Sequence, residues 1–226
     1  MIPKHVGFIV DGNRRWARSN GKSMLEGHRQ GALRAREIAL YCIKEGITVA
    51  SFYGFSTENW KRSDAEVAVL MKLFEWLADQ FFADLIKLGI KVRHLGKLDG
   101  LPNSLQRAIL RVTEASKHNT KLILNIAINY GGHDEIVRAA QKLMRGGSQP
   151  DEVTEASFEK LLDTADLPPV DLVIRTGGRH RSSNFLPWQT AYAELYFTGL
   201  LWPDFSPAEF DKALAWFAEQ KRNFGA

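Results

Sequence analysis

Cysteine is nearly absent from this sequence, since Cys42 is the only one among 226 residues. A single cysteine excludes an intramolecular disulfide framework and fits a reducing compartment. Long apolar runs are missing too: none has the length needed to span a bilayer, and the run near the N-terminus is too short for a signal peptide. We therefore expect a soluble, cytoplasmic protein with at most peripheral membrane contact.

Blocks of like charge, internal repeats and low-complexity tracts are absent as well. The formal net charge is +4, a modest basic excess that suits a phosphorylated small molecule, an anionic lipid or a nucleic acid. The lack of a basic tail argues against nucleic acid. Hydrophobic residues make up 45% of the chain, which is enough for one sizeable core, so we expect a single domain over residues 1–226.

Short apolar runs alternate along the chain with segments of helical periodicity. We expect strands over residues 6–10, 47–55, 90–95, 121–128, 170–174 and 194–197. Helices are expected over residues 29–45, 64–88, 101–117, 132–144, 154–163 and from residue 206 onward, with cap pairs at Ser63/Glu66, Asn103/Gln106 and Ser206/Glu209. This alternation predicts an α/β fold with a mostly parallel sheet of about six strands and helices on both faces.

The first expected strand ends in a polar turn. The sequence after it reads Asp11-Gly12-Asn13-Arg14-Arg15, which joins a carboxylate, a glycine turn and two guanidinium groups. An open α/β sheet binds its ligand beyond the carboxyl ends of its strands. The groups in this turn suit an anion, such as phosphate with a divalent metal. A plain strand-to-helix turn with surface arginines is the alternative.

Three other expected strands also end in polar residues. The segments that follow them read STENWKR at 56–62, NYGG at 129–132 and RTGGRHRSSN at 175–184. Because parallel strands bring their carboxyl ends to one edge of the sheet, we expect these segments to lie close to the Asp11 turn. Together they predict an active site that binds phosphate groups.

These segments resemble the cis-prenyltransferase family, which includes undecaprenyl diphosphate synthase. The matching pieces are HVGFIVDGNRRWAR, the Gly27-His28 pair, FYGFSTENWKR, LNIAINYGG, DLVIRTGGRHRSSNF and QTAYAELYFTGLLWPDF, and they extend over almost the whole chain. The resemblance implies a homodimeric α/β enzyme that uses Mg²⁺. It would condense an allylic prenyl diphosphate with isopentenyl diphosphate and form a cis double bond.

The resemblance also implies residue roles. Asp11 would be catalytic and hold Mg²⁺, and Glu194 would be a second metal ligand, although a strand-edge glutamate is the alternative for Glu194. The allylic diphosphate would be bound by Gly12, Asn13, Arg14, Arg15, Trp16 and His28, although His28 could instead only begin a helix. Asn59 would be catalytic by positioning a proton path, because an amide is a poor base. Isopentenyl diphosphate would be bound by Ser56, Thr57, Glu58, Trp60, Arg62, Arg175, Arg181, Ser182 and Ser183.

The helix expected over residues 64–88 has a broad apolar face, which by itself predicts core packing. In the family that the chain resembles, this helix lines a tunnel for the growing isoprenoid. Phe81 and Phe82 would then form a floor that limits product length, and Leu122 would be a further tunnel residue.

Four positions depart from the family pattern. Met24 stands where an arginine is usual, Arg14 where glycine is common, Arg179 where glutamate is common and Pro187 where leucine is expected. Arg14 could partly replace the charge missing at Met24. These changes concern substrate choice and product length, and they would also suit an enzyme that makes short or branched, head-to-middle isoprenoid diphosphates.

Two non-enzymatic hypotheses compete with this one. A catalytically inactive partner subunit should have lost Asp11 or the arginines at 175 and 181, yet all are present. A nucleic-acid-binding module should carry a basic stripe with exposed aromatic residues, whereas the aromatic residues here fall mostly on apolar faces. The sequence therefore favours the enzyme.

Overall fold

The computed structural model describes residues 1–222, apart from the side chain of Gln80. Its centre is a six-stranded sheet in which every neighbouring pair is parallel, with the order β3-β4-β2-β1-β5-β6. The strands are β1 (His5–Ile9), β2 (Val49–Ser56), β3 (Ile90–Leu95), β4 (Leu122–Tyr130), β5 (Leu172–Arg175) and β6 (Glu194–Phe197). The predicted fold class and strand number are confirmed.

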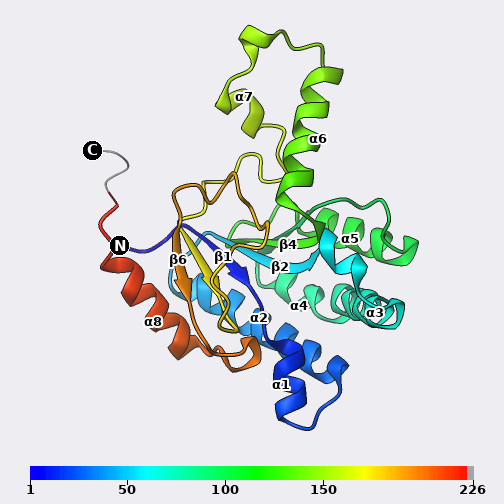
Figure 1. Ribbon diagram of the computed structural model, residues 1–226, viewed down its shortest axis with the longest axis vertical. Coiled ribbons are helices and arrows are strands. Elements are labelled where there is room, and N and C mark those ends of the chain that lie inside the picture. The colour runs from blue at the N-terminus through cyan, green and yellow to red at the C-terminus, as the bar shows by residue number, and fades with distance from the viewer. Residues whose placement is uncertain (223–226) are drawn as a thin grey trace.

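Five helices cover one face of the sheet (Figure 1). Their core includes Phe8 of β1 and Phe52 of β2, whose rings stack with centroids 4.7 Å apart. Burial of apolar surface of this extent is the main stabilising contribution to folding. The helices are α2 (Met24–Lys44), α3 (Asp64–Gln80), α4 (Phe82–Lys87), α5 (Asn103–Ser116) and α8 (Pro207–Ala218).

The opposite face is covered mainly by a loop. Phe185 and Leu186 are fully buried there against Tyr53 and Tyr130. Helix α6 (Gly132–Arg145) begins at this face and then projects away from the sheet, with α7 (Glu155–Glu159) beside its outer part (Figure 1). The prediction of helices on both faces therefore holds, but the second layer is thinner than the first.

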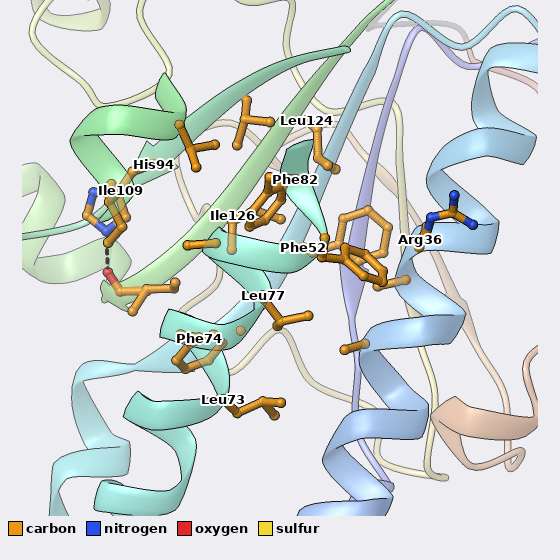
Figure 2. Close-up of a pocket in the computed structure, with 18 of the residues that line it drawn as sticks. Arg36, Phe52, Leu73, Phe74, Leu77, Phe82, His94, Ile109, Leu124 and Ile126 are labelled. Atoms are coloured by element: carbon orange, nitrogen blue, oxygen red, sulfur yellow. Dashed lines mark hydrogen bonds between the residues drawn. The ribbon is translucent and has the colours of Figure 1, made fainter. Parts of the chain in front are cut away.

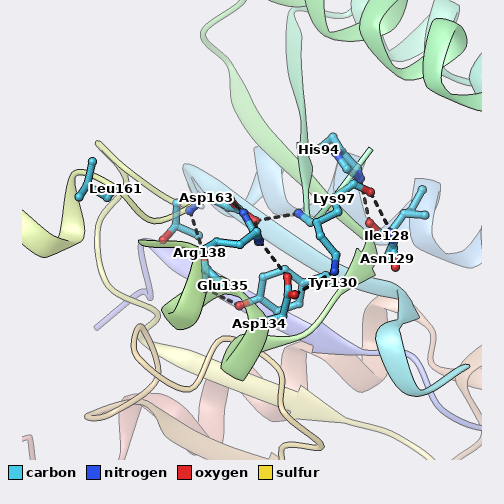
Figure 3. Close-up of polar contacts among 12 residues, drawn as sticks. His94, Lys97, Ile128, Asn129, Tyr130, Asp134, Glu135, Arg138, Leu161 and Asp163 are labelled. Carbon is cyan, nitrogen blue, oxygen red and sulfur yellow. Dashed lines mark hydrogen bonds and ion pairs between the residues drawn. The ribbon is translucent and has the colours of Figure 1, made fainter. Parts of the chain in front are cut away.

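A buried polar network connects β4, α6 and the segment after α7 (Figure 3). Arg138 forms a two-pronged ion pair with Asp163, with distances of 2.8 and 2.7 Å, and also contacts Asp134 at 2.8 Å. The Glu135 carboxylate accepts hydrogen bonds from the Tyr130 hydroxyl at 2.6 Å and from the backbone N–H of Asp163 at 2.8 Å. Burial raises the pKa of Glu135. The network fixes the base of the projecting helix to the sheet.

Helix boundaries differ from the sequence-based expectation in two places. Helix α2 begins at Met24 rather than at residue 29, because Ser23 and Glu26 form a complete capping box. The long helix expected over residues 64–88 is broken at Phe81, where α3 ends and α4 starts. Phe81 and Phe82 both line the same cavity. Consecutive residues of an uninterrupted helix point about 100° apart, so the break allows both rings to face it.

The remaining differences are smaller. The Asn103/Gln106 cap pair does not form: Pro102 precedes the helix, and the Gln106 amide donates to the backbone carbonyl of Leu101. Helix α7 ends at Glu159 instead of residue 163, because the segment turns so that the Asp163 N–H reaches Glu135. No helix within residues 1–222 combines the length and apolar character needed to cross a membrane.

Candidate active site

A polar pocket of about 800 Å³ opens beyond the carboxyl ends of β1, β2 and β5. Its walls come from the turn after β1, the 3₁₀ helix η1 (Thr57–Lys61) after β2, and the loop after β5. Most of the predicted site residues line it, namely Asp11, Gly12, Asn13, Arg14, Arg15, His28, Ser56, Glu58, Asn59, Arg62, Arg175, Arg181 and Ser183. The strand ends that the sequence pointed to are thus brought together.

Gly12 makes the turn that places Asp11 in the pocket and starts α1 (Asn13–Ser19). Its φ of 118° lies in the region that favours glycine, and a Cβ there would be 3.0 Å from the backbone of Leu201. The Asp11 carboxylate accepts hydrogen bonds from Arg15 at 3.2 Å and from Arg175 at 3.1 Å. It remains about 31% exposed, so it is still accessible to a ligand in the pocket.

Arg175 is the most buried cation of the pocket, with 4% of its surface exposed. Besides Asp11, it contacts the Ser183 hydroxyl and the backbone carbonyl of Arg181, each at 2.6 Å. Its Nε is buried without a partner. Such a group is costly unless something binds it, so Arg175 is suited to hold an anion such as a diphosphate oxygen.

The pocket wall formed by η1 is stabilised by a hydrogen bond between a side chain and the backbone. The Asn59 carbonyl oxygen accepts from the backbone N–H of Ser56 at 3.0 Å. Glu58 accepts from the side chain of Asn184 at 3.2 Å. Burial acts to raise the pKa of Glu58, but hydrogen bonds from its own backbone N–H and from Ser56, Asn184 and Thr57 outweigh it and lower that pKa. Glu58 is therefore a carboxylate at neutral pH.

A second wall is made by two arginines that share one carboxylate. Glu66, at the start of α3, accepts from Arg14 at 3.2 Å and from Arg62 at 2.9 Å. This use of its side chain explains why only half of the predicted Ser63/Glu66 capping box forms, with Ser63 accepting from the Glu66 N–H. The pairing fixes Arg14, the residue that departs from the family pattern, at the edge of the pocket.

His28 lines the polar pocket and also the apolar cavity beside it. Burial, reinforced by Arg62 and Arg14, lowers the pKa of His28 to about 4, so its ring is neutral at physiological pH. Its Nε2 is buried without a hydrogen-bond partner, and so is the nearby Oδ1 of Asn13. Both atoms lie in lining residues of the pocket, which suits them to contact a polar atom of a ligand.

An apolar cavity of about 130 Å³ adjoins the polar pocket (Figure 2). Five residues line both spaces: Val10, Asn13, His28, Gly54 and Leu70. Most of its other walls are apolar side chains of α2, α3, α4, α5 and the sheet, including Phe52, Phe74, Phe81, Phe82, Leu124 and Ile126, together with Arg36, Arg93, His94 and Thr113. The predicted floor residues Phe81 and Phe82 line the cavity, whereas Leu122 is fully buried elsewhere and does not.

Several predicted site residues do not line the polar pocket. Trp16 donates to Asp204 at 2.7 Å, and Trp60 donates to Asn129 at 2.8 Å and packs edge-on against Phe55. Thr57 and Ser182 are not part of the lining either. Conversely, Tyr53 and Asn184 line the pocket and were missed. The sequence contained a signal for both residues. Asn184 belongs to the polar segment 175–184, and Tyr53 lies in the strand that leads into the segment 56–62.

Glu194 lies at a different place from Asp11. It is the first residue of β6 and is paired with Leu172, three residues before Arg175. Three residues of strand correspond to about 10 Å, so Glu194 is near the amino end of the sheet while Asp11 is beyond its carboxyl end. The chain by itself does not bring the two predicted metal ligands together, and the metal role of Glu194 stays a prediction.

The donor set has one carboxylate suited to Mg²⁺. Within residues 1–222 no group of three or more His, Cys, Asp or Glu side chains is arranged to hold a metal ion. Mg²⁺, however, is usually bound by one or two carboxylates together with substrate phosphates and water. Asp11, partly exposed at the mouth of a pocket rich in arginine, fits that mode.

Comparison with known proteins agrees with this geometry. The family described as "Putative undecaprenyl diphosphate synthase" matches residues 9–225. A relative from Escherichia coli is named ditrans,polycis-undecaprenyl-diphosphate synthase, (2E,6E)-farnesyl-diphosphate specific. It is 44% identical over 226 residues, covering 98% of this chain and 89% of that protein.

Two solved structures are similar over nearly the full length. One is lavandulyl diphosphate synthase from Lavandula x intermedia in complex with dimethylallyl diphosphate. It has a TM-score of 0.95 and 36% identity, and the match covers 100% of this chain and 99% of that chain. The other, described as a "probable undecaprenyl diphosphate synthase", is from Campylobacter jejuni, with a TM-score of 0.84, 33% identity and 99% coverage of both chains. The chain therefore belongs to the undecaprenyl diphosphate synthase family of prenyltransferases.

Proposed function

We propose that this protein is a Mg²⁺-dependent transferase that condenses isopentenyl diphosphate with an allylic prenyl diphosphate and forms a cis prenyl diphosphate. The observation that carries the proposal is the junction of two unlike spaces. A polar pocket rich in arginine continues at His28 and Asn13 into a cavity lined by aliphatic and aromatic side chains. A prenyl diphosphate has this same division, with a charged head and a hydrocarbon tail.

The reaction breaks the C1–O bond of the allylic substrate, and both electrons of that bond leave with the diphosphate. C1 then bonds to C4, the terminal alkene carbon of isopentenyl diphosphate, with the electron pair of its C3=C4 double bond, which leaves a cation at C3. Loss of a proton from C2 then forms the new double bond between C2 and C3. Arg14, Arg15 and the backbone N–H groups at the start of α1 would stabilise charge on the departing diphosphate. Mg²⁺ held by Asp11 would add to that stabilisation when bound.

The second diphosphate would bind to Arg175, Arg181 and Ser183. Arg181 forms no ion pair within residues 1–222, and Arg175 has a free Nε, so both can contact an anion. Asn59 would position the lost proton toward a phosphate oxygen or water, since its amide is not itself a base. The neutral His28 ring, which lines both spaces, would contact the oxygen next to C1.

The proposal includes a homodimer made of two copies of the 1–226 domain in the cytoplasm. β6 is an edge strand of the sheet, and Leu195 on it is 42% exposed. On the projecting α6, Val137 and Met144 are 54% and 81% exposed. An edge strand with exposed apolar residues favours burial against a second chain. A chain with one cysteine forms no intramolecular disulfide, which is consistent with a reducing compartment.

A second candidate function is a short or branched, head-to-middle coupling on the same fold. The similarity to lavandulyl diphosphate synthase, with a TM-score of 0.95, favours it. The size of the apolar cavity also favours this function, because its volume of about 130 Å³ is close to that of the ~150 Å³ cavity that accommodates one benzene ring. Without rearrangement of Phe81 and Phe82, the space suits roughly one five-carbon unit.

One assay separates the two functions. The protein is incubated with dimethylallyl, geranyl or farnesyl diphosphate, each with and without isopentenyl diphosphate, in Mg²⁺ or in excess chelator, and product masses are measured. Cis condensation requires isopentenyl diphosphate and adds five carbons per step. A ten-carbon diphosphate from dimethylallyl diphosphate alone would identify head-to-middle coupling. Absence of any carbon–carbon coupling would refute both.

A further inference from the structure

The loop after Arg181 has an unusual backbone. Ser183, Asn184 and Leu186 all have positive φ, at 51°, 66° and 49°. Residues other than glycine rarely adopt this region, and each such residue costs of order 1–3 kcal/mol unless its surroundings impose the conformation. Three of them in four residues indicate that this loop is held in place by strong contacts.

Asn184 provides most of those contacts. Its backbone carbonyl accepts from the N–H of Gly132 at 2.9 Å, and its side-chain oxygen accepts from the N–H of His133 at 2.9 Å. Both donors belong to the first turn of α6, whose N–H groups have no partner within the helix. The side-chain NH₂ of Asn184 then donates to Glu58 at 3.2 Å. Asn184 thus uses its backbone and both ends of its amide.

The glycine pair of the NYGG segment makes this approach possible. A Cβ on Gly132 would lie 2.0 Å from the ring of Pro187 and 3.0 Å from the Asn184 carbonyl oxygen. The NYGG segment was expected to contribute to the pocket itself. Instead neither glycine lines the pocket, and the segment supports the loop that does.

Asn184 therefore connects two walls of the polar pocket. Glu58 belongs to η1 after β2, while Ser183 and Arg181 belong to the loop after β5. Ser183 has a further contact, because the Tyr53 hydroxyl donates to its backbone carbonyl at 3.3 Å. The wall that contains Asp11 and Arg15 is formed by Gly12 and α1. It is linked to the loop after β5 through Arg175, which contacts Asp11, Ser183 and the Arg181 carbonyl, but it has no hydrogen bond to the Asn184 side chain.

We propose that Asn184 is a positioning residue that fixes Glu58 relative to Arg181 and Ser183, and thereby sets the affinity for the diphosphate bound on that side of the pocket. This inference rests on the proposed function for the identity of that ligand, isopentenyl diphosphate. A residue of this kind affects the binding of one substrate and leaves the binding of the allylic substrate unchanged.

Two variants separate the hydrogen bonds from the backbone conformation. Asn184→Asp keeps the shape and the bond from His133, but it places a carboxylate against Glu58. Asn184→Gly keeps the positive φ and loses both side-chain bonds. We expect Asn184→Asp to raise the KM for isopentenyl diphosphate about tenfold, as loss of a hydrogen bond to a charged group does. The KM for the allylic diphosphate should change less than twofold.

The double variant Asn184→Asp with Glu58→Gln is the decisive control, because it restores a donor–acceptor pair with the roles exchanged. Its KM for isopentenyl diphosphate should return to within about threefold of that of Glu58→Gln alone. If Asn184→Asp leaves this KM unchanged, raises both KM values equally, or is not rescued, the proposal is wrong. If Asn184→Asp does not fold, Asn184→Gly must raise the KM for isopentenyl diphosphate about tenfold and change the KM for the allylic diphosphate less than twofold.

Direct titration with inorganic pyrophosphate makes the test independent of turnover. Because the pocket is proposed to hold two diphosphates, the affinity that is compared is that of the binding step lost in Arg181→Gln. We expect wild-type protein to bind pyrophosphate, Asn184→Asp to bind it about tenfold more weakly, and the double variant to recover relative to Glu58→Gln. If the wild type forms no coupled product with any substrate pair, the proposed function fails, but the pyrophosphate series still decides the role of Asn184. Equal affinity of all variants would overturn it.

Discussion

Two polar clusters lie beyond the carboxyl ends of this sheet, and they differ in charge balance. The network around Arg138 and Asp163 pairs its charges internally (Figure 3). Lys97 and Arg138 contact Asp134, Arg138 also contacts Asp163, and the Glu135 carboxylate accepts from the Tyr130 hydroxyl and from the backbone N–H of Asp163. The polar pocket is lined by five arginines, at positions 14, 15, 62, 175 and 181. They face three carboxylates: Asp11 and Glu58 in the lining, and Glu66, which pairs with Arg14 and Arg62.

This difference distinguishes a structural cluster from a binding site. A balanced and packed set of charges satisfies itself and holds elements together, whereas an excess of one sign around an open volume is stabilised by a ligand of the other sign. Three buried side-chain atoms without a partner belong to residues of the pocket lining: the Arg175 Nε, the His28 Nε2 and the Asn13 Oδ1. The Oε1 of Gln189, whose NH₂ group donates to Glu135 of the network, is a further such atom outside the pocket. The following predictions test this contrast.

The largest effect is expected for Asp11→Asn. This change keeps the shape but removes the charge that would hold Mg²⁺ beside the leaving diphosphate. We expect kcat to fall about a thousandfold, comparable to the loss of a main electrostatic contact in other active sites. Steady-state product formation measures it, and thermal unfolding serves as the folding control. Activity within tenfold of wild type would show that Asp11 is not the metal ligand.

Arg138→Met should act on stability instead of on activity. It leaves Asp163, whose side chain is only 12% exposed, without its two-pronged partner. Removing one member of such a pair costs about 3–5 kcal/mol of unfolding free energy. Urea unfolding measures this loss, and the double variant Arg138→Met with Asp163→Asn should recover part of it. A change in either substrate KM without a loss of stability would contradict the assignment of this cluster as structural.

The buried histidines make the unfolding free energy of the protein depend on pH. Burial lowers the pKa of His5 to about 4, with opposing contributions from the Pro168 carbonyl and Asp171, against about 6.5 in the unfolded chain. The unfolded state therefore binds more protons between these values, so stability falls as the pH drops from 6.5 toward 4. For His5 the loss is about 3 kcal/mol, because each pKa unit corresponds to about 1.4 kcal/mol.

His5→Gln should be less stable than the wild type at pH 7 but lose less on acidification. The pKa of His28 is lowered to a similar value. Because His5→Gln still contains His28, part of the pH dependence of its unfolding free energy remains. Unfolding free energies at pH 7.0, 5.5 and 4.5 give the slopes. A slope equal to that of the wild type would mean that His5 does not titrate as described.

The smallest effect is expected for Arg14→Gly, which restores the residue common in the family. Arg14 is about 60% exposed, so loss of its ion pair with Glu66 should alter stability by less than about 1 kcal/mol. The KM for the allylic diphosphate should rise about tenfold, since a charge-assisted contact is lost. Arg18→Gly, at an exposed position outside the pocket, is the matched control. An unchanged allylic KM would exclude Arg14 from that side of the pocket.

Much of the fold follows from the sequence because its signals are local. Apolar runs, caps such as Ser206 with Glu209, and strand–helix alternation predict six parallel strands and their order along the chain. The break at Phe81 could not be predicted, since it depends on two rings facing one cavity. The start of α2 at Met24 could have been predicted, because Ser23 and Glu26 have capping-box spacing.

For the site, residue type and position after a strand identified most of the lining. They could not show that Trp60 binds Asn129 instead of a ligand, or that Asn184 connects two loops, because both facts depend on contacts between segments remote in sequence. Glu194 is a contrasting case, because the strand expected over residues 194–197 is β6 itself. The sequence pattern therefore already placed Glu194 at the amino end of a parallel strand, and Asp11 beyond the carboxyl end of another.

The pairing of Asp11 with Arg175 has a consequence for synthesis of the protein. The two residues are 164 positions apart, and β1 lies between β2 and β5 in the sheet. Contacts of such separation form late and slow the folding of a chain. On the ribosome, β1 has no partner on its β5 side until some 175 residues have emerged, so the nascent N-terminal half exposes an unpaired strand edge and depends on protection from aggregation until then.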